Sequence, residues 1–268
     1  MRMNEPIFVV GVPRSGTTLL RVMLDSHPNI ACGPEFPLLT ENVSRIWGRD
    51  WPCTESFSKG IPLKVFENFG FSESDIHSFC STFIDTIFSE YARRKKKARW
   101  AIKVPRTVEK IYYLSQLFPD AFFIHCIRDG RDVVASSMAQ RQKRPDWYPG
   151  ADLEDFARDW VRMIGSARSD GDGVHHYLEL HYEELIREPE VILSKIISFI
   201  GETWEDSLLR YHSLQHDFSA RELSTNDVQK PLYSEAVGSW RSRLSEYEMD
   251  RIMEVEGFKG LLETEGYL

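Results

Sequence analysis

A glycine-containing loop near the start of the chain constrains its fold more than any other feature. The loop runs from Gly11 to Thr18 with the sequence GVPRSGTT, follows the apolar run Ile7–Val10 and leads into a helix-like stretch, Leu19–Asp25. A strand, a glycine loop and a helix in this order form a cradle in which backbone N–H groups and a helix N-terminus converge on an anion. The segment therefore predicts a site for a phosphate-like group.

The loop departs from ordinary nucleotide-triphosphate sites at one position. Its spacing is that of a Walker A motif, but Thr17 stands where the P-loop lysine belongs. Arg14 supplies a positive charge from inside the loop instead. This pattern points away from ATP and GTP chemistry, yet a P-loop small-molecule kinase stays an alternative. That alternative needs a magnesium-binding acid, for which the sequence offers Asp129.

Apolar runs alternate with helical patterns along the chain, which predicts an α/β fold with a P-loop-type central parallel sheet flanked by helices. We expect one domain over residues 1–268, with strands at Ile7–Val12, Arg99–Val104, Phe122–Arg128 and His176–Leu180. The expected helices are Leu19–Asp25, Asp75–Tyr91, Val108–Leu117, Arg131–Arg141, Leu153–Ser169 and Pro189–Ile200. The C-terminal third is expected to be mostly helical, with an irregular stretch around 219–238. Ligands of such folds bind at the carboxyl ends of the strands.

Composition excludes some classes of protein. A net charge of -8 argues against a general nucleic-acid or membrane-surface binder, so an anionic ligand needs a local basic pocket. The segment Met1–Pro6 is short and polar, and the apolar runs are too short to span a bilayer, so we expect neither signal peptide nor membrane span. The four cysteines lack metal-ligand spacing, which predicts free thiols in the cytoplasm and no metal site.

A second loop at a predicted strand end carries another anion-binding pattern. Residues 128–136 have the sequence RDGRDVVAS. Arg128 offers a bidentate, charge-assisted pair to a phosphate, and Ser136 on the following helix adds a hydroxyl donor. The structural alternative, equally open, is that Arg128 pairs with Asp129 or Asp132 at the start of the helix.

Together the two loops resemble those of sulfotransferases that use 3′-phosphoadenosine 5′-phosphosulfate (PAPS), most of all the tyrosylprotein sulfotransferase branch. The matching stretches are GVPRSGTTLLRVMLDSHPNIACGPE, the strand end at Lys103, FPDAFFIHCIRDGR, LHYEEL, LSTNDVQKP and Ser239-Trp240. The resemblance implies an enzyme that moves a sulfuryl group from PAPS to an acceptor hydroxyl and releases 3′-phosphoadenosine 5′-phosphate (PAP). Fixed cations then take the role that magnesium has in kinases, so no metal is expected.

The resemblance also implies roles for individual residues. Those expected to bind the donor are Arg14, Ser15, Gly16, Thr17 and Thr18 at the 5′-phosphosulfate, Arg128 and Ser136 at the 3′-phosphate, and Tyr182 at the nucleotide. Those expected to act in catalysis are Glu35 as the base, Lys103 and Arg14 on the leaving phosphate, and Ser224 near the transferring group. Whether Arg141 or Arg241 also contacts PAPS stays open.

The chain also departs from that branch. Pro34 stands where the branch has a second acid, and the peptide-contacting segments beyond Glu35 do not match, which leaves a protein tyrosine acceptor in doubt. Carbohydrate, lipid, natural-product, phenol and peptide hydroxyls all stay open as acceptors, as do the oligomeric state and the role of residues 36–98. Cys32 corresponds to a disulfide-bonded cysteine, but its partner position is Ala101, and Ser239 replaces a lysine.

Plainer structural readings exist for several of these residues. Glu35 is otherwise an exposed loop acid, Lys103 a solvated strand-end lysine and Ser224 a turn cap. We expect His27 and His125 to be structural, whereas Trp47 and Trp51 either stack on an acceptor ring or pin a loop. The alternative to an enzyme is a non-catalytic regulator that binds PAP or another nucleotide.

Overall fold

The computed structural model describes residues 5–36, 68–103, 105–219, 222 and 224–268. Its centre is a five-stranded sheet in the order β2-β3-β1-β4-β5, in which every neighbouring pair is parallel. The strands are β1 (Ile7–Val10), β2 (Ile30–Cys32), β3 (Arg99–Lys103), β4 (Phe122–Ile127) and β5 (Tyr177–His181). The expected α/β fold with a central parallel sheet is therefore confirmed.

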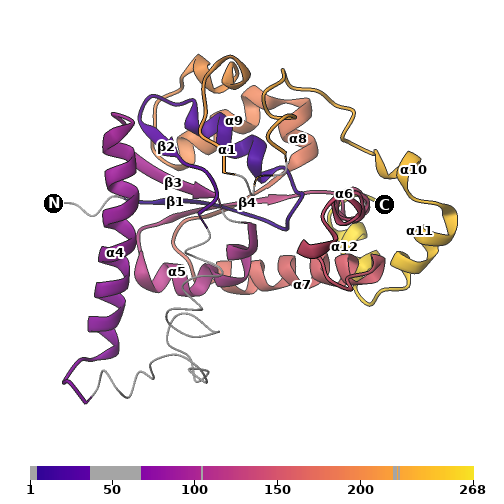
Figure 1. Ribbon diagram of the computed structural model, residues 1–268, viewed down its shortest axis with the longest axis horizontal. Helices are drawn as coiled ribbons and strands as arrows, with labels where there is room; N and C mark the ends of the chain where they lie inside the picture. Colours follow the sequence, from indigo (N-terminus) through magenta and orange to yellow (C-terminus); the bar gives the residue numbers. More distant parts are fainter. Residues whose placement is uncertain (1–4, 37–67, 104, 220–221, 223) are drawn as a thin grey trace.

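Helices cover both faces of this sheet (Figure 1). One face packs against α1 (Thr17–Asp25), α8 (Tyr182–Arg187) and α9 (Pro189–Phe199), and the other against α4 (Glu73–Arg94), α5 (Ile111–Leu117), α6 (Gly130–Lys143) and α7 (Leu153–Gly171). Phe8 and Val10 of β1 enter the second core, whereas Ile7 and Val9 enter the first. Because both faces of the strand are buried, its sequence is apolar without alternation.

The elements of the chain differ from the sequence expectations in four places, one of which is the short helix α8, which was not expected. The strand β2 was not expected, because three residues at a sheet edge are too few for a recognisable pattern. The expected helix Val108–Leu117 is a 3₁₀ segment, Pro105–Lys110, followed by α5. The described part of the C-terminal third is not mostly helical: after α8 and α9 comes a largely irregular segment, followed by α10 (Trp240–Arg243), α11 (Glu246–Met253) and α12 (Phe258–Thr264).

The order of the strands places the two predicted loops side by side. β1 lies between β3 and β4, with Val9 opposite Lys103 and Val10 opposite His125. The loop after β1, the end of β3 and the loop after β4 therefore meet at one edge of the sheet. In parallel α/β sheets this carboxyl edge is where ligands bind.

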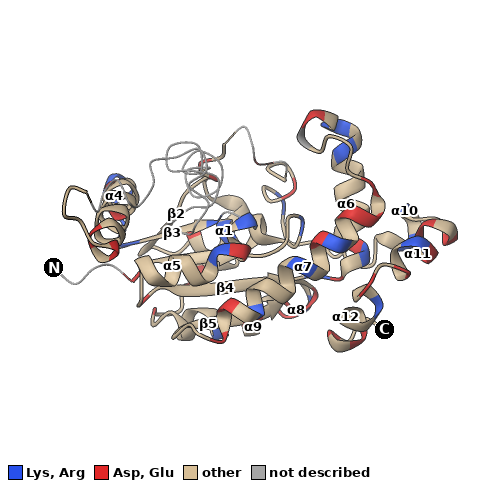
Figure 2. Cartoon of the chain, turned by 90° about the horizontal axis from the view of Figure 1, so that it is seen from below, with Lys and Arg blue, Asp and Glu red and all other residues tan. Residues whose placement is uncertain are grey.

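The surface of the described part carries charges of both signs. Lys and Arg share the outer helices α4, α7 and α11 with Asp and Glu (Figure 2). Among the helices described here, none combines the length and apolar character needed to cross a membrane. The cytoplasmic location and the single-domain boundary at 1–268 stay predictions.

Candidate active site

A cavity of about 700 Å³ opens at the carboxyl edge of the sheet. The predicted site residues that line it are Arg14, Gly16, Thr17, Thr18, Glu35, Arg128, Ser136, Tyr182 and Ser224. The other two predicted residues, Ser15 and Lys103, do not line the cavity and are fully buried. The fold thus brings together residues from both loops, from the chain after β2 and from the irregular C-terminal segment, although their roles stay predictions.

The loop after β1 is held in a conformation that suits an anion. Arg14 has a φ of 79° and Gly16 a φ of 88°, both in the left-handed region. A Cβ at Gly16 would lie 2.2 Å from Cδ2 of the Tyr182 ring, so only glycine fits there. Within the described part of the chain, no side chain caps the N-terminus of α1 at this point, which leaves its first N–H groups available to a ligand.

Arg14 is a partly buried cation without a carboxylate partner among the described residues. Its Nε donates to Oγ of Ser136 at 3.0 Å, and burial lowers the pKa of its guanidinium. Two fully enclosed polar atoms nearby in the described part, Oγ of Ser15 and Nε of Arg128, have no hydrogen-bond partner. Buried donors left in this state are costly unless a ligand satisfies them, so the residues present fit an anion with several acceptor oxygens.

Arg128 holds the two loops together. Its Nη1 donates to the carbonyl oxygen of Arg14 at 3.0 Å, and its Nη2 donates to the carbonyl oxygen of Ala236. The guanidinium lies over the Tyr182 ring, 4.7 Å from the centroid, and 3.6 Å from a carboxylate oxygen of Asp132. Arg128 can therefore pair with Asp132 and still contact a ligand, because its side chain lines the cavity.

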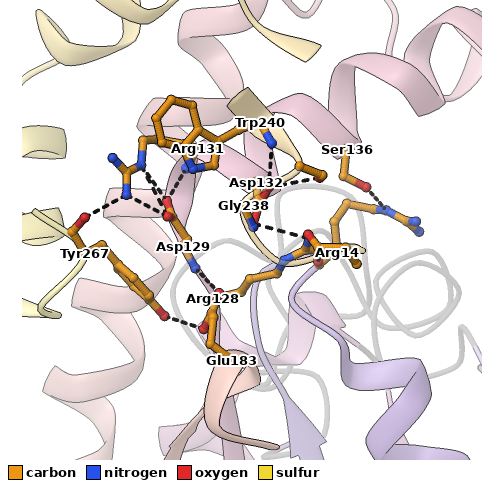
Figure 3. A network of polar contacts seen from close by, with 12 residues as sticks. Arg14, Arg128, Asp129, Arg131, Asp132, Ser136, Glu183, Gly238, Trp240 and Tyr267 are labelled. Atoms are coloured by element: carbon orange, nitrogen blue, oxygen red, sulfur yellow. Dashed lines mark hydrogen bonds and ion pairs between the residues drawn. The ribbon is translucent and has the colours of Figure 1, made fainter. Parts of the chain in front are cut away.

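The C-terminal segment is fastened to the start of α6 by Asp132 (Figure 3). Its fully buried carboxylate accepts from N–H of Gly238 at 2.7 Å, N–H of Trp240 at 2.8 Å and Oγ of Ser239 at 3.0 Å. Ser239, which stands where the tyrosylprotein branch has a lysine, thus has a structural contact with Asp132. The sequence alone did not predict these contacts, because Asp132 and Gly238 lie 106 residues apart along the chain.

A neighbouring set of contacts reaches the end of the chain. Arg131 pairs with Asp129 at 2.8 Å and donates to the carbonyl oxygen of Tyr267 at 2.7 Å. The Tyr267 hydroxyl in turn donates to Glu183 at 2.8 Å (Figure 3). Asp129, the acid available to the kinase alternative, is thus occupied by an arginine.

The second set of charges lies at the end of β3, and we name Glu35, Lys103, Arg21 and Glu222 the transfer cluster. Lys103 donates to Oγ1 of Thr18 at 3.1 Å and forms an ion pair with Glu35. Glu222 lies 3.5 Å from Nζ of Lys103 and 3.1 Å from Nε of Arg21. Lys103 is therefore not a solvated strand-end lysine, and Glu35 is not a free loop acid. Two cations and two carboxylates balance each other here.

The cavity wall holds further charged and aromatic residues that the sequence reasoning missed. It has five basic residues, Arg14, Arg106, Arg128, Lys143 and Arg243, against three acidic ones, Glu35, Asp146 and Asp227. This local surplus of positive charge contrasts with the net charge of -8 on the whole chain. Burial raises the pKa of the lining residues Tyr182 and Tyr233, so both stay neutral hydroxyl donors near neutral pH.

Several other residues singled out in the sequence lie away from the cavity. Arg141 is half-buried, and Arg241 is exposed with its guanidinium 4.5 Å from the Trp240 centroid; neither lines the cavity. His27 is structural, as expected, since its Nε2 lies 2.8 Å from the carbonyl oxygen of Thr203. Trp47 and Trp51 lie outside the described residues.

The buried core on the two faces of the sheet holds a histidine and three cysteines. His125 is fully buried with Nδ1 2.6 Å from the Tyr177 hydroxyl, although its Nε2 has no partner among the described residues. Cys32 and Cys126 are free thiols, and both are buried, as is Cys80. Cys32 lies opposite Ala101 in the β2–β3 register, so a cysteine at 101 would face it on the adjoining strand.

Comparison with known proteins assigns the chain to a family. Residues 6–206 match the profile described as "Sulfotransferase family". The chain is 30% identical over 278 residues to protein-tyrosine sulfotransferase A of Caenorhabditis elegans, covering 99% of this chain and 68% of that protein. It is 32% identical over 246 residues to protein-tyrosine sulfotransferase 2 of Gallus gallus, covering 87% of this chain and 62% of that protein.

Solved structures agree on the fold. The sulfotransferase domain of the Synechococcus PCC 7002 olefin synthase superposes with a TM-score of 0.64 at 21% identity, over 95% of each chain. Mouse sulfotransferase SULT7A1, solved in complex with PAP, superposes with a TM-score of 0.53 at 16% identity, over 96% of this chain and 84% of that one. From the profile match and the 30% identity, this chain belongs to the sulfotransferase family.

Proposed function

We propose that this protein transfers a sulfuryl group from PAPS to an acceptor hydroxyl and releases PAP and a sulfate ester. The observation that carries the proposal is the pair of arginines, Arg14 and Arg128, which contact a hydroxyl and main-chain carbonyls and line one cavity. Such cations suit a ligand with two separate anionic groups. Membership in the sulfotransferase family supports this reading over the kinase alternative.

The donor would lie with its two anionic ends on the two loops. Arg14, Thr17, Thr18 and the N–H groups at the start of α1 would bind the 5′-phosphosulfate, with Ser15 as a further donor. Arg128 and Ser136 would bind the 3′-phosphate. The Nε–Oγ contact between Arg14 and Ser136, at 3.0 Å, supports one continuous site for both ends.

The transfer step requires a base on one side of sulfur and positive charge on the other. Glu35 would take the proton of the acceptor hydroxyl while the new O–S bond forms. The bond between sulfur and the bridging phosphate oxygen breaks, and its electron pair stays on that oxygen. Lys103 and Arg14 would stabilise the charge that develops there, with Ser224 near the transferring group.

The position of Glu35 supports this division of roles. Its side chain is 23% exposed, lines the cavity and pairs with Lys103, which itself is fully buried. The base is therefore open to an acceptor, while the lysine faces the phosphate loop through Thr18.

Binding of PAP tests the donor assignment first. A charge-assisted clamp on the 3′-phosphate contributes about 1.5–3 kcal/mol, so we expect calorimetry without magnesium to give PAP an affinity about 10- to 150-fold above 5′-AMP. ADP and ATP serve as controls for general phosphate binding. Equal affinity for PAP and 5′-AMP, or magnesium-dependent binding of ATP, would contradict the proposal.

Turnover of PAPS then separates an enzyme from a non-catalytic regulator. The names of the relatives put a tyrosine-containing peptide first among the acceptors to be tried, followed by simple phenols, alcohols and carbohydrates. We expect transfer of the sulfuryl group to at least one of these classes of acceptor. Tight PAP binding without transfer to any acceptor or to water would favour the regulator.

A further inference from the structure

Glu222 is a buried acid to which the transfer scheme above gives no role. Its side chain and those of Lys103 and Arg21 have no exposed surface. Oε1 lies 3.1 Å from Nε of Arg21 and 3.5 Å from Nζ of Lys103, and Oε2 accepts from N–H of Ser219 at 3.0 Å. The carboxylate therefore joins the irregular C-terminal segment to α1 and to the end of β3.

The two cations that Glu222 contacts are themselves attached to the proposed reaction site. Lys103 donates to Thr18 in the phosphate loop and pairs with Glu35. Arg21 donates to the carbonyl oxygen of Cys32, three residues before Glu35, at 3.1 Å. Because Glu222 is buried, we infer that among the described residues it acts on the reacting groups through these two side chains.

The charge balance of the cluster changes during the proposed transfer. Before it, Glu35 and Glu222 together balance Lys103 and Arg21. When Glu35 accepts the acceptor proton, its negative charge is lost and an equal charge develops on the leaving phosphate oxygen. A buried ammonium needs a partner at every stage, and Glu222 is the second carboxylate beside Lys103, at 3.5 Å from its Nζ.

We propose that Glu222 is a positioning residue that anchors Lys103, so that the ammonium can turn from Glu35 toward the leaving oxygen without losing its counter-charge. This inference rests on the proposed function of the same site. It predicts that Glu222 affects the rate of transfer through Lys103 and leaves donor binding at Arg128 nearly unchanged.

A double-mutant cycle isolates that dependence. Glu222→Gln, Lys103→Gln and the double variant are compared with the wild type for PAP affinity and for turnover of PAPS. Turnover is followed with the best acceptor found and in single-turnover hydrolysis, where water is the acceptor. The matched control is Glu202→Gln, because Glu202 pairs with Arg99 at 3.1 Å at the opposite end of β3.

We expect Glu222→Gln to lower turnover about 10- to 100-fold, the range for a charge-assisted contact, with PAP affinity within about 3-fold of wild type. In the Lys103→Gln background the same change should lower turnover by less than about 3-fold, because residues that act as a unit are not additive. The Glu202→Gln control should keep wild-type turnover even where it lowers stability.

Three results would overturn the inference. Equal losses from Glu222→Gln in both backgrounds would mean that Glu222 does not act through Lys103. A loss of PAP affinity that matches the loss of turnover would indicate a general structural role. If Glu222→Gln does not fold, Glu222→Asp retains the charge but shortens the side chain, and full turnover in that variant would reject anchoring. Absence of turnover in the wild type is a separate result, which rejects the proposed function and this inference with it.

Discussion

Two groups of charged residues at and behind the cavity wall use their cations differently. At the donor end, which comprises Arg14, Arg128 and Ser136, the arginines contact a hydroxyl and main-chain carbonyls, and Asp132 lies 3.6 Å from Arg128 alone. In the transfer cluster, each cation contacts a carboxylate at 3.5 Å or less. The donor end keeps positive charge in surplus, whereas the transfer cluster has none.

We expect this difference to separate residues that bind the donor from residues that act in the transfer step. Surplus charge that is withdrawn from water is costly until an anion neutralises it, so the donor end gains most from a doubly anionic ligand. In the transfer cluster the cations already face carboxylates, so we expect the cluster to add little to ground-state binding and to redistribute charge when a proton moves. Variants at the donor end should therefore change affinity, and variants in the transfer cluster should change rate.

The largest effect is expected at Glu35. Glu35→Gln removes the base while it keeps shape and hydrogen bonding, so turnover should fall about 10²- to 10⁴-fold with PAP affinity nearly unchanged. Steady-state kinetics and calorimetry on the same preparation measure both quantities, and the exposed Glu205→Gln serves as control. Turnover within a few-fold of wild type would remove Glu35 as the base.

At Arg128 we expect the opposite result, a loss of PAP affinity. Arg128→Ala should weaken PAP binding about 10- to 150-fold while 5′-AMP, which lacks the 3′-phosphate, loses only a few-fold. Arg128→Lys should fall between, because it keeps the charge but not the bidentate geometry. The comparison is made by calorimetry, and equal weakening of both nucleotides would reject the clamp.

Gly16 tests how the donor end is held. At φ 88° and 2.2 Å from the Tyr182 ring, an added Cβ is strained and crowded, so Gly16→Ala should lower stability by about 1–3 kcal/mol and weaken PAP binding. Gly260→Ala in α12 is the matched control, since a Cβ added there would meet nothing within 4 Å and alanine favours a helix. Denaturant unfolding measures both, and equal stability for the two variants would contradict the strain argument.

The smallest effect, on the stability of the fold, is expected at Asp25, which contacts the chain just before Glu35. Asp25 accepts from N–H of Cys32 at 3.0 Å and lies 2.7 Å from Nδ1 of His216 and 3.3 Å from Nζ of Lys97. Burial by itself would raise the pKa of Asp25, but the hydrogen bond with His216 and the charge of Lys97 outweigh it and lower that pKa. The folded state therefore favours the ionised carboxylate.

The sign of the pH dependence follows from that lowered pKa. Stabilisation by Asp25 should be fully present above the ordinary aspartate pKa of about 3.9 and should be lost as the pH falls through the lower folded-state value. Asp25→Asn should therefore be less stable than wild type near neutral pH, with the gap closing below about pH 4. Urea unfolding across this range measures the gap, and a gap independent of pH would show that packing, not charge, decides it.

Local sequence was enough for most of the sheet and for the donor loops. The strand, loop and helix around Gly11–Thr18 follow one another directly, so their pattern predicts both conformation and anion binding. The sequence did not predict the short or irregular parts, namely β2 and the chain before α10. Their conformation depends on what they pack against rather than on their own periodicity.

The sequence by itself determined the α/β class, the cradle after β1 and the candidate residues Glu35, Lys103 and Arg128. Only the tertiary structure decided which groups surround them. Arg14 meets Ser136 across 122 residues, and the C-terminal segment brings Glu222 to Lys103 and Gly238 to Asp132. Contacts between distant segments leave no periodic trace in a sequence, because they form only when the sheet aligns its strand ends and the chain closes over them.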